Sequence, residues 1–167
     1  MDFNDILYKI ANNIAEVTTM DIAIVGARAQ ALCRAAQLDA HPFPVLADAA
    51  GRAWDLLALA RDAAKTPFFG DIRARNLLLP GDSDPSFAQG MGALQVVGYG
   101  FSPRDTLTLS SVTGAERLLC LQRSLLTADG ALLEPQELPL SPALSTLSED
   151  DALLVAGLRL LSPCARS

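Results

Sequence analysis

The residues from 105 to 133 read DTLTLSSVTGAERLLCLQRSLLTADGALL, and this stretch decides the fold class that we expect for the chain. Residues 105–109 alternate polar and apolar side chains, which is the period of a strand with one buried face. A second β-compatible run follows from 117 to 126 and leads to Asp129-Gly130. Asp-Gly between apolar runs favours a tight hairpin turn, because both residues tolerate a positive φ. The stretch therefore predicts an antiparallel sheet.

The chain before residue 66 predicts helices. Apolar residues recur at helical spacing over 3–17, again over 18–37, and a third time over 45–65 after two prolines that cannot continue a helix. The expected fold class is α+β, with three N-terminal helices in a helical region at 1–66. An antiparallel β-sheet or small β-sandwich follows in a β-rich domain at 71–167.

Within the β-rich region, residues 71–79 and 94–101 are expected as strands, separated by a loop at 81–92. Gly98 and Gly100 mark a bulge or a close approach of backbones in the second strand. Residues 152–161 are apolar on all sides and fit a buried closing strand or a C-terminal helix. The helix is favoured, because Ser148 and three acidic residues precede the run and suit a helix N-terminus.

The composition favours protein partners. The 167 residues carry a net charge of −6 and only 19% charged residues, against roughly 25% in an average globular chain. Two lysines stand against eleven arginines, which is typical of interface cores but also follows from base composition in a genome. An acidic chain without basic runs does not suit broad nucleic-acid binding. We expect homo- or hetero-oligomeric assembly and no nucleic-acid partner.

Three distant cysteines, Cys33, Cys120 and Cys164, predict neither a disulfide framework nor a zinc site. The N-terminus lacks the basic and apolar regions of a signal peptide. The apolar run at 152–161 is about half the length of a membrane-spanning helix. We therefore expect a protein that is cytoplasmic at synthesis, without metal, cofactor or membrane partner, and with a virion as one destination.

Residues 77–84 place Gly81-Asp82-Ser83 after an apolar run, which is similar to the nucleophile block of GDSL-type hydrolases. That family activates its serine with a downstream Asp-x-x-His motif. The one histidine of this chain is His41, which lies upstream in the proline-containing segment at 41–44, so no base is expected near Ser83. A solvated turn explains the same residues, and no catalytic residue is expected.

Three arginines are candidates for anion binding. Residues 122–130, followed by Pro139, resemble the strand, Asp-Gly turn and strand of chorismate lyases and their ligand-binding relatives. The resemblance implies that an arginine of the first strand holds a carboxylate, although Arg123 falls one position away from the family's arginine. Arg73 and Arg75 share one face of an expected strand, where they either clamp a carboxylate or phosphate or protect a sheet edge.

Phe68 and Phe69 are the main interface candidates, and Trp54 is a third that equally suits the core. The first-ranked function is a non-catalytic structural or assembly subunit of a larger protein complex, with a virion or phage-tail component as its most concrete version. One alternative is a small-carboxylate-binding enzyme or sensor. Another is an adaptor that binds one partner through the helical half.

Overall fold

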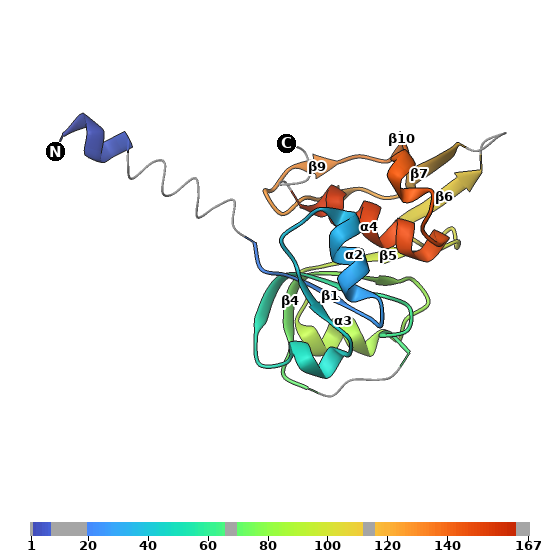
Figure 1. Cartoon of the computed structure of the whole chain (residues 1–167), viewed down its shortest axis with the longest axis horizontal. Helices are drawn as coiled ribbons and strands as arrows, with labels where there is room; N and C mark the ends of the chain where they lie inside the picture. Colours follow the sequence, from blue (N-terminus) through green and yellow to red (C-terminus); the bar gives the residue numbers. More distant parts are fainter. Residues whose placement is uncertain (1, 8–19, 66–69, 112–115, 163–167) are drawn as a thin grey trace.

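The computed structural model describes residues 2–7, 20–65, 70–111 and 116–162. Its main element is one eight-stranded mixed sheet (Figure 1). After a short helix at residues 3–7, the elements follow in the order β1 (Ile22–Val25), α2 (Ala29–Ala36), β2 (His41–Phe43), the 3-10 helix η1 (Leu46–Ala49), β3 (Ala53–Leu59), β4 (Arg73–Pro80), α3 (Ser86–Met91), β5 (Gln95–Tyr99), β6 (Leu107–Ser111), β7 (Arg117–Leu121), β8 (Leu125–Leu126), β9 (Leu132–Leu133), β10 (Gln136–Pro139), the 3-10 helix η2 (Pro142–Leu144) and α4 (Glu149–Leu161).

The strands of the sheet lie in the order β10-β7-β6-β5-β4-β3-β1-β2. All neighbours from β2 to β6 pair in parallel, whereas β7 pairs antiparallel with both β6 and β10. The order β2-β1-β3-β4-β5 is one of the common orders of doubly wound α/β sheets, in which the carboxyl ends of the strands meet at one edge. The direction of winding reverses between β1 and β3. Strands β8 and β9 form a separate hairpin.

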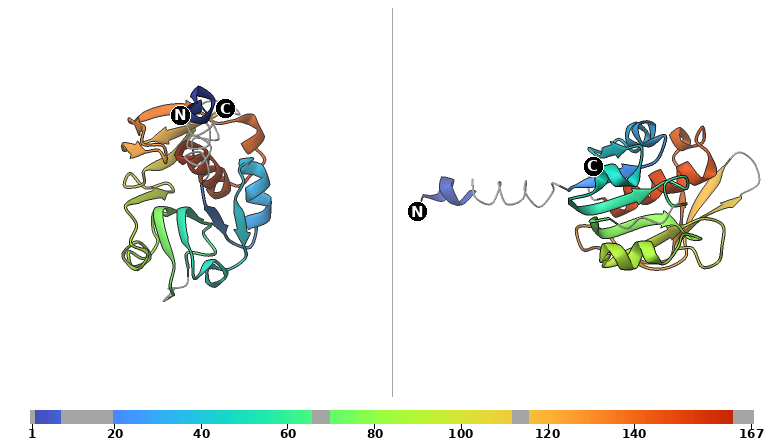
Figure 2. Two further views of the ribbon diagram at one scale, coloured as in Figure 1. Left: turned by 90° about the vertical axis from the view of Figure 1, so that its left-hand side faces the viewer. Right: turned by 90° about the horizontal axis from the view of Figure 1, so that it is seen from below.

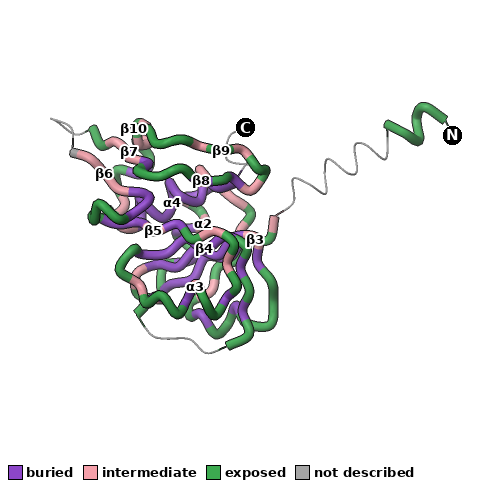
Figure 3. The backbone as a smooth tube through the Cα atoms, turned by 180° about the vertical axis from the view of Figure 1, so that it is seen from behind, coloured by how far each residue is buried: buried purple, intermediate pink, exposed green. Residues whose placement is uncertain are grey.

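Helices cover both faces of the parallel strands. Helices α2 and α4 pack against one face in one apolar cluster, and η1 and α3 pack against the other face in a second cluster. Figure 2 shows α2 and α3 on opposite sides of the strands. Helix α4 approaches the sheet closely at Gly157, where a Cβ atom would lie 2.9 Å from Leu107 and 3.0 Å from Leu78. The buried residues accordingly lie mainly in the central strands and in α4 (Figure 3).

The prediction of three N-terminal helices is wrong. Residues 22–25 are the buried parallel strand β1 and residues 53–59 are β3, while helix is found at 29–36 and at 3–7. Short apolar runs that are buried on both faces carry no period of two, so they match a helical stripe as well as a strand. The three-helix region on which an adaptor surface was expected is therefore not present as predicted. Residues 8–17 of the first expected helix lie outside the described residues.

The antiparallel sheet or sandwich is wrong for most of the β structure, because the parallel strands β1 to β5 belong to the same sheet as β6, β7 and β10. This sheet takes strands from both sides of the expected boundary near residue 66. The local predictions of the second half are confirmed more closely: strands lie at 73–80 and 95–99, and the hairpin β8–β9 encloses Gly130 with φ +86°. The loop expected at 81–92 contains α3.

The C-terminal segment is the favoured helix, α4. Its N-cap residue is Ser148, whose Oγ accepts a hydrogen bond from the Asp151 backbone N–H at 3.2 Å, and three acidic residues fill the first turn. Negative side chains there are stabilised by the positive end of the helix dipole. Across the described part of the chain, no helix combines the length and apolar character that crossing a membrane requires.

Candidate functional site: a cleft at the carboxyl edge of the parallel strands

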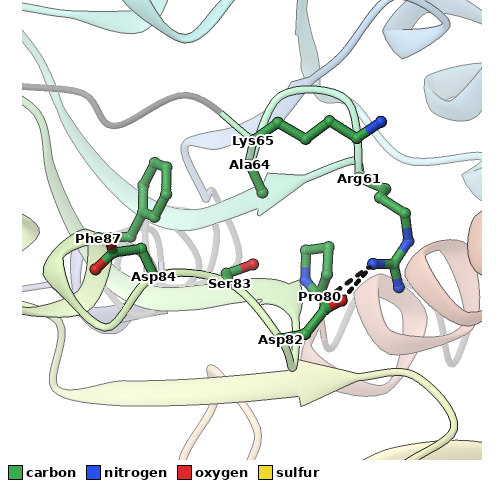
Figure 4. Close-up of a pocket in the computed structure, with 8 residues that line it drawn as sticks. All are labelled: Arg61, Ala64, Lys65, Pro80, Asp82, Ser83, Asp84 and Phe87. Carbon is green, nitrogen blue, oxygen red and sulfur yellow. Dashed lines mark hydrogen bonds and ion pairs between the residues drawn. The ribbon is translucent and has the colours of Figure 1, made fainter.

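The loops that follow β3, β4 and β5 enclose two adjoining cavities of about 260 and 420 Å³. Both cavities are lined by Arg61, which follows β3, and by Asp82, which follows β4. Figure 4 shows these two residues in the smaller cavity. Ligands of open parallel sheets bind outside the carboxyl ends of the strands, because the loops there converge. The cleft thus lies where this architecture most often carries a binding site.

Arg61 is held between two carboxylates. Its Nε and Nη2 atoms donate to Asp150 at 2.9 and 3.3 Å, and its Nη1 atom donates to both oxygens of Asp82 at 2.9 and 3.0 Å. These hydrogen bonds, that with Asp150 first, raise the pKa of Arg61. The two partners differ in exposure, since the Asp82 side chain is 75% exposed and that of Asp150 is 33% exposed. Asp150 therefore fixes the guanidinium, whereas Asp82 reaches it from solvent.

The smaller cavity adds Lys65, Ser83 and Asp84 to this pair. The Oγ atom of Ser83 is buried and has no hydrogen-bond partner among the described residues. In Figure 4, Asp84 and Phe87 lie on the far side of the pocket from Arg61. The Ser86 backbone N–H donates to Asp84 at 2.9 Å and lowers the pKa of that carboxyl group. Ser83 is left as a hydroxyl that a bound molecule can satisfy.

The larger cavity contains a buried carboxylate. Asp105 is 5% exposed, lines this cavity, and accepts a hydrogen bond from the Ser102 backbone N–H at 2.9 Å through Oδ2. A Cβ atom on Gly81 would lie 1.5 Å from its Oδ1 atom, and one on Gly100 would lie 2.5 Å from Oδ2. Only glycine at these two positions leaves room for the carboxylate, so the strand ends of β4 and β5 are shaped around it.

Tyr99 forms part of the wall of the larger cavity. Its hydroxyl donates to the Leu59 carbonyl at 2.8 Å and so connects the carboxyl ends of β5 and β3 beneath the loops. Burial, followed by the nearby charge of Asp150, raises the pKa of Tyr99. The phenol is therefore neutral at physiological pH and supports the cleft as a hydrogen-bond donor.

The crevice between β1 and β3, where the winding reverses, is occupied by the chain itself. The Ala27 backbone N–H, just before α2, donates to Asp62 Oδ2 at 2.9 Å. A Cβ atom on Gly26 would lie 2.7 Å from the Ala60 Cβ atom, so the two loops are in contact. A phosphate that approached this position would compete with the Asp62 carboxylate. The two cavities that share Arg61 and Asp82 lie one strand further along, at β3, β4 and β5.

The arginines singled out from the sequence lie elsewhere. Arg123 is exposed in the segment between β7 and β8 and lines neither cavity of the cleft. Arg73 and Arg75 begin β4 and line a separate cavity of about 320 Å³ at the opposite end of that strand. The hairpin that carries the resemblance to chorismate lyases is thus present, but its arginine is not grouped with Arg73 and Arg75.

The aromatic interface candidates divide between the core and the undescribed segments. Trp54 is 2% exposed, and its Nε1 atom donates to the Ala49 carbonyl at 3.1 Å. Phe68 and Phe69 lie outside the described residues. Of the turn residues, Ser83 does line the cleft. His41 lies in the edge strand β2, with its ring 5.6 Å from that of Trp54.

Sequence reasoning missed Arg61, Asp105 and Asp150. The signal that could have identified Arg61 and Asp82 is their position. Each lies two residues beyond the end of an apolar run that forms a parallel strand. Such residues come together only if both runs are recognised as parallel. Asp150 was noted as a helix-start residue, but its pairing with Arg61 spans 89 positions and leaves no local pattern.

Comparisons of the chain with protein-family models, with curated proteins and with solved structures found no match. Within the described ranges, no three side chains of histidine, cysteine, aspartate or glutamate are grouped so as to hold a metal ion. The chemistry of the cleft must therefore be argued from its own residues.

Proposed function

We propose that this chain binds a small polar molecule with a carboxylate or phosphate group in the cleft at the carboxyl edge of β3, β4 and β5. The observation that carries the proposal is that the two carboxylates bound to Arg61 differ in exposure. Asp150 fixes the guanidinium, and the exposed Asp82 binds it from the solvent side. This keeps the small-carboxylate-binding function expected from the sequence, with Arg61 as the anchoring residue in place of Arg123.

Replacement of Asp82 by a ligand is energetically feasible. An ion pair with one partner as exposed as Asp82 contributes about 0.2–1 kcal/mol, because water screens it. A ligand carboxylate or phosphate can accept from the same Nη1 atom and in addition from the nearby Lys65 or from the Ser83 hydroxyl, which has no hydrogen-bond partner among the described residues. The ligand therefore gains hydrogen bonds that Asp82 does not make.

The proposal is tested by measuring melting temperatures with a panel of small organic acids and phosphate monoesters. A ligand that binds the folded state raises the melting temperature by mass action. In labelled protein, the same compounds should shift the amide resonances of residues 81–84. The affinity of Arg61→Gln for the ligand should be at least about tenfold lower than that of the unaltered chain, since a charge-assisted hydrogen bond is lost.

Arg117→Gln is the matched control. Arg117 pairs with Glu149 in the same first turn of α4, at 3.8 Å, and its side chain is 42% exposed against 36% for Arg61. This variant should retain full binding, because Arg117 does not line the cleft. No shift with any compound, or an equal loss in both variants, would refute the proposal.

A second function, self-association, is supported by a separate group of exposed apolar side chains. Leu126 and Leu132 are 50% and 59% exposed and pair with each other across the hairpin β8–β9. Exposed apolar groups of this kind favour contact with another protein surface. Nothing in this group points to a virion rather than to another assembly.

The self-association proposal is tested by light scattering on a double variant, Leu126→Ser with Leu132→Ser. The mass in solution should fall toward the 17.6 kDa of a single chain. Val45→Ser is the control, since Val45 is 54% exposed and lies before η1, away from the hairpin. A single-chain mass for the unaltered protein at micromolar concentration and above would contradict the proposal.

A further inference from the structure

Asp105 is a residue of low exposure, 5%, whose carboxylate lines the larger cavity. Oδ2 accepts from Ser102, but no hydrogen bond to Oδ1 is found among the described residues. The neighbouring amide of Gln122 donates to the Asp105 backbone carbonyl at 2.8 Å rather than to the carboxylate. Carboxylates of low exposure are normally paired with a cation or fully hydrogen-bonded. The arrangement favours a partner that comes from the cavity.

The charges around the larger cavity indicate what that partner is. Its lining contains two cations, Arg61 and Arg104, and two anions, Asp82 and Asp105, and Arg61 is already occupied by Asp82 and Asp150. No ion pair of Asp105 is found within the described residues. A purely anionic ligand can satisfy Arg61 but leaves Asp105 unpaired. A ligand with one acidic and one positively charged group satisfies both.

We infer that the cleft is specific for a zwitterion of the amino-acid type, whose acidic group replaces Asp82 on Arg61 and whose ammonium group binds Asp105. This inference rests on the proposed binding function and names the chemical class of its ligand. The glycines at 81 and 100 are then part of the specificity, because they alone allow Asp105 to lie between the ends of β4 and β5. The exposed ring of Phe101 borders the same cavity and can cover an apolar side chain of the ligand.

The experiment compares pairs of probes that differ only at the second group: L-alanine with L-lactate, L-leucine with L-2-hydroxy-4-methylpentanoate, and L-phenylalanine with L-3-phenyllactate. Dissociation constants are measured with the full chain by calorimetry or by NMR titration. The amino acid should bind about tenfold or more tightly than its hydroxy acid in at least one pair, because an ammonium group gives Asp105 a charge-assisted hydrogen bond. This comparison needs no variant and stands even if a substituted protein does not fold.

Asp105→Asn separates recognition from a purely structural role. The asparagine side chain has the same shape and can still accept from the Ser102 N–H, so the turn formed by Ser102 and Asp105 is kept. If Asp105 reads the ammonium group, the preference for the amino acid should fall to nearly one in this variant. If Asp105 only fastens the turn, the preference should not change, and the inference is overturned.

The outcomes distinguish the inference from the proposed function. Equal binding of amino and hydroxy acids that is lost in Arg61→Gln would overturn the zwitterion inference and leave the binding function standing. Failure of all amino acids, hydroxy acids and phosphate monoesters to bind would overturn both.

Discussion

The parallel and antiparallel parts of the sheet differ in how many of their faces are covered. Strands β1, β3 and β4 are packed on both faces, and the last four residues of each are buried. Strands β7 and β10 pack against the α4 side, and three of the five residues of β7 and all four residues of β10 are half-buried or exposed. Coverage of both faces creates a core with convergent loops at one edge, and these loops form the cleft. The antiparallel part extends the sheet but does not line the two cavities.

The largest expected effect is on stability, and it compares one leucine from each part. Leu57→Ala in β3 removes a fully buried side chain and should cost about 2–5 kcal/mol of unfolding free energy. Leu118→Ala in β7 truncates a half-buried side chain and should cost about 1 kcal/mol. Urea denaturation with unchanged slopes measures both values. Similar losses in the two variants would mean that the parts share one equally packed core.

The same difference in coverage explains what the sequence could predict. Residues 105–109 alternate polar and apolar side chains, and this pattern predicted the strand now seen as β6; the hairpin and the C-terminal helix carry local signals at Asp129-Gly130 and Ser148. The runs at 22–25 and 53–59 have no such period, because both faces are buried. Their parallel pairing also joins residues more than 30 positions apart, which no local pattern specifies.

The candidate site could not be predicted from the sequence, because the parallel strands that position it were not recognised. Ser83 was noticed because Gly-Asp-Ser is a recognisable turn, and the structure places it in the cleft. Arg61 falls within the run expected as a helix at 45–65, so the sequence pattern did not indicate its position after a strand. Asp105 was predicted as the first, polar residue of a strand with one buried face, whereas it is a buried residue before β6. Both roles depend on strand order rather than on a motif.

An intermediate effect is expected at Tyr99, which is the last residue of β5 on the parallel side of the sheet. Tyr99→Phe removes the hydrogen bond to the Leu59 carbonyl and should cost about 1–2 kcal/mol at pH 7. The pKa of Tyr99 is raised above its ordinary value of 10.0, chiefly by burial. A group whose pKa is raised on folding stabilises the folded state below its unfolded pKa and loses that contribution as the pH rises above it.

The advantage of the unaltered chain over Tyr99→Phe should therefore be constant below about pH 10 and should shrink above it. Urea titrations at several pH values between 7 and 11 measure this difference. All other titrating groups are common to both proteins, so they cancel in the comparison. A difference that does not change with pH would show that the Tyr99 hydroxyl is not buried at this edge.

The smallest effect concerns Asp82, and it tests whether the carboxyl edge of the parallel part is held open for a ligand. Asp82→Asn removes the exposed partner of Arg61, so the free energy of unfolding should fall by less than about 1 kcal/mol. The affinity for a ligand that uses Arg61 should rise about two- to fivefold, because the ligand no longer displaces a carboxylate. Asp84→Asn is the matched control: it makes the same charge change in the same loop, but Asp84 accepts from Ser86 and makes no ion pair with Arg61. A gain in affinity confined to Asp82→Asn would mean that the Asp82 carboxylate and the acidic group of the ligand compete for the Arg61 guanidinium. An equal gain in both variants would reduce the effect to the general charge of the loop, and Asp82 would then have no special part in controlling access to Arg61.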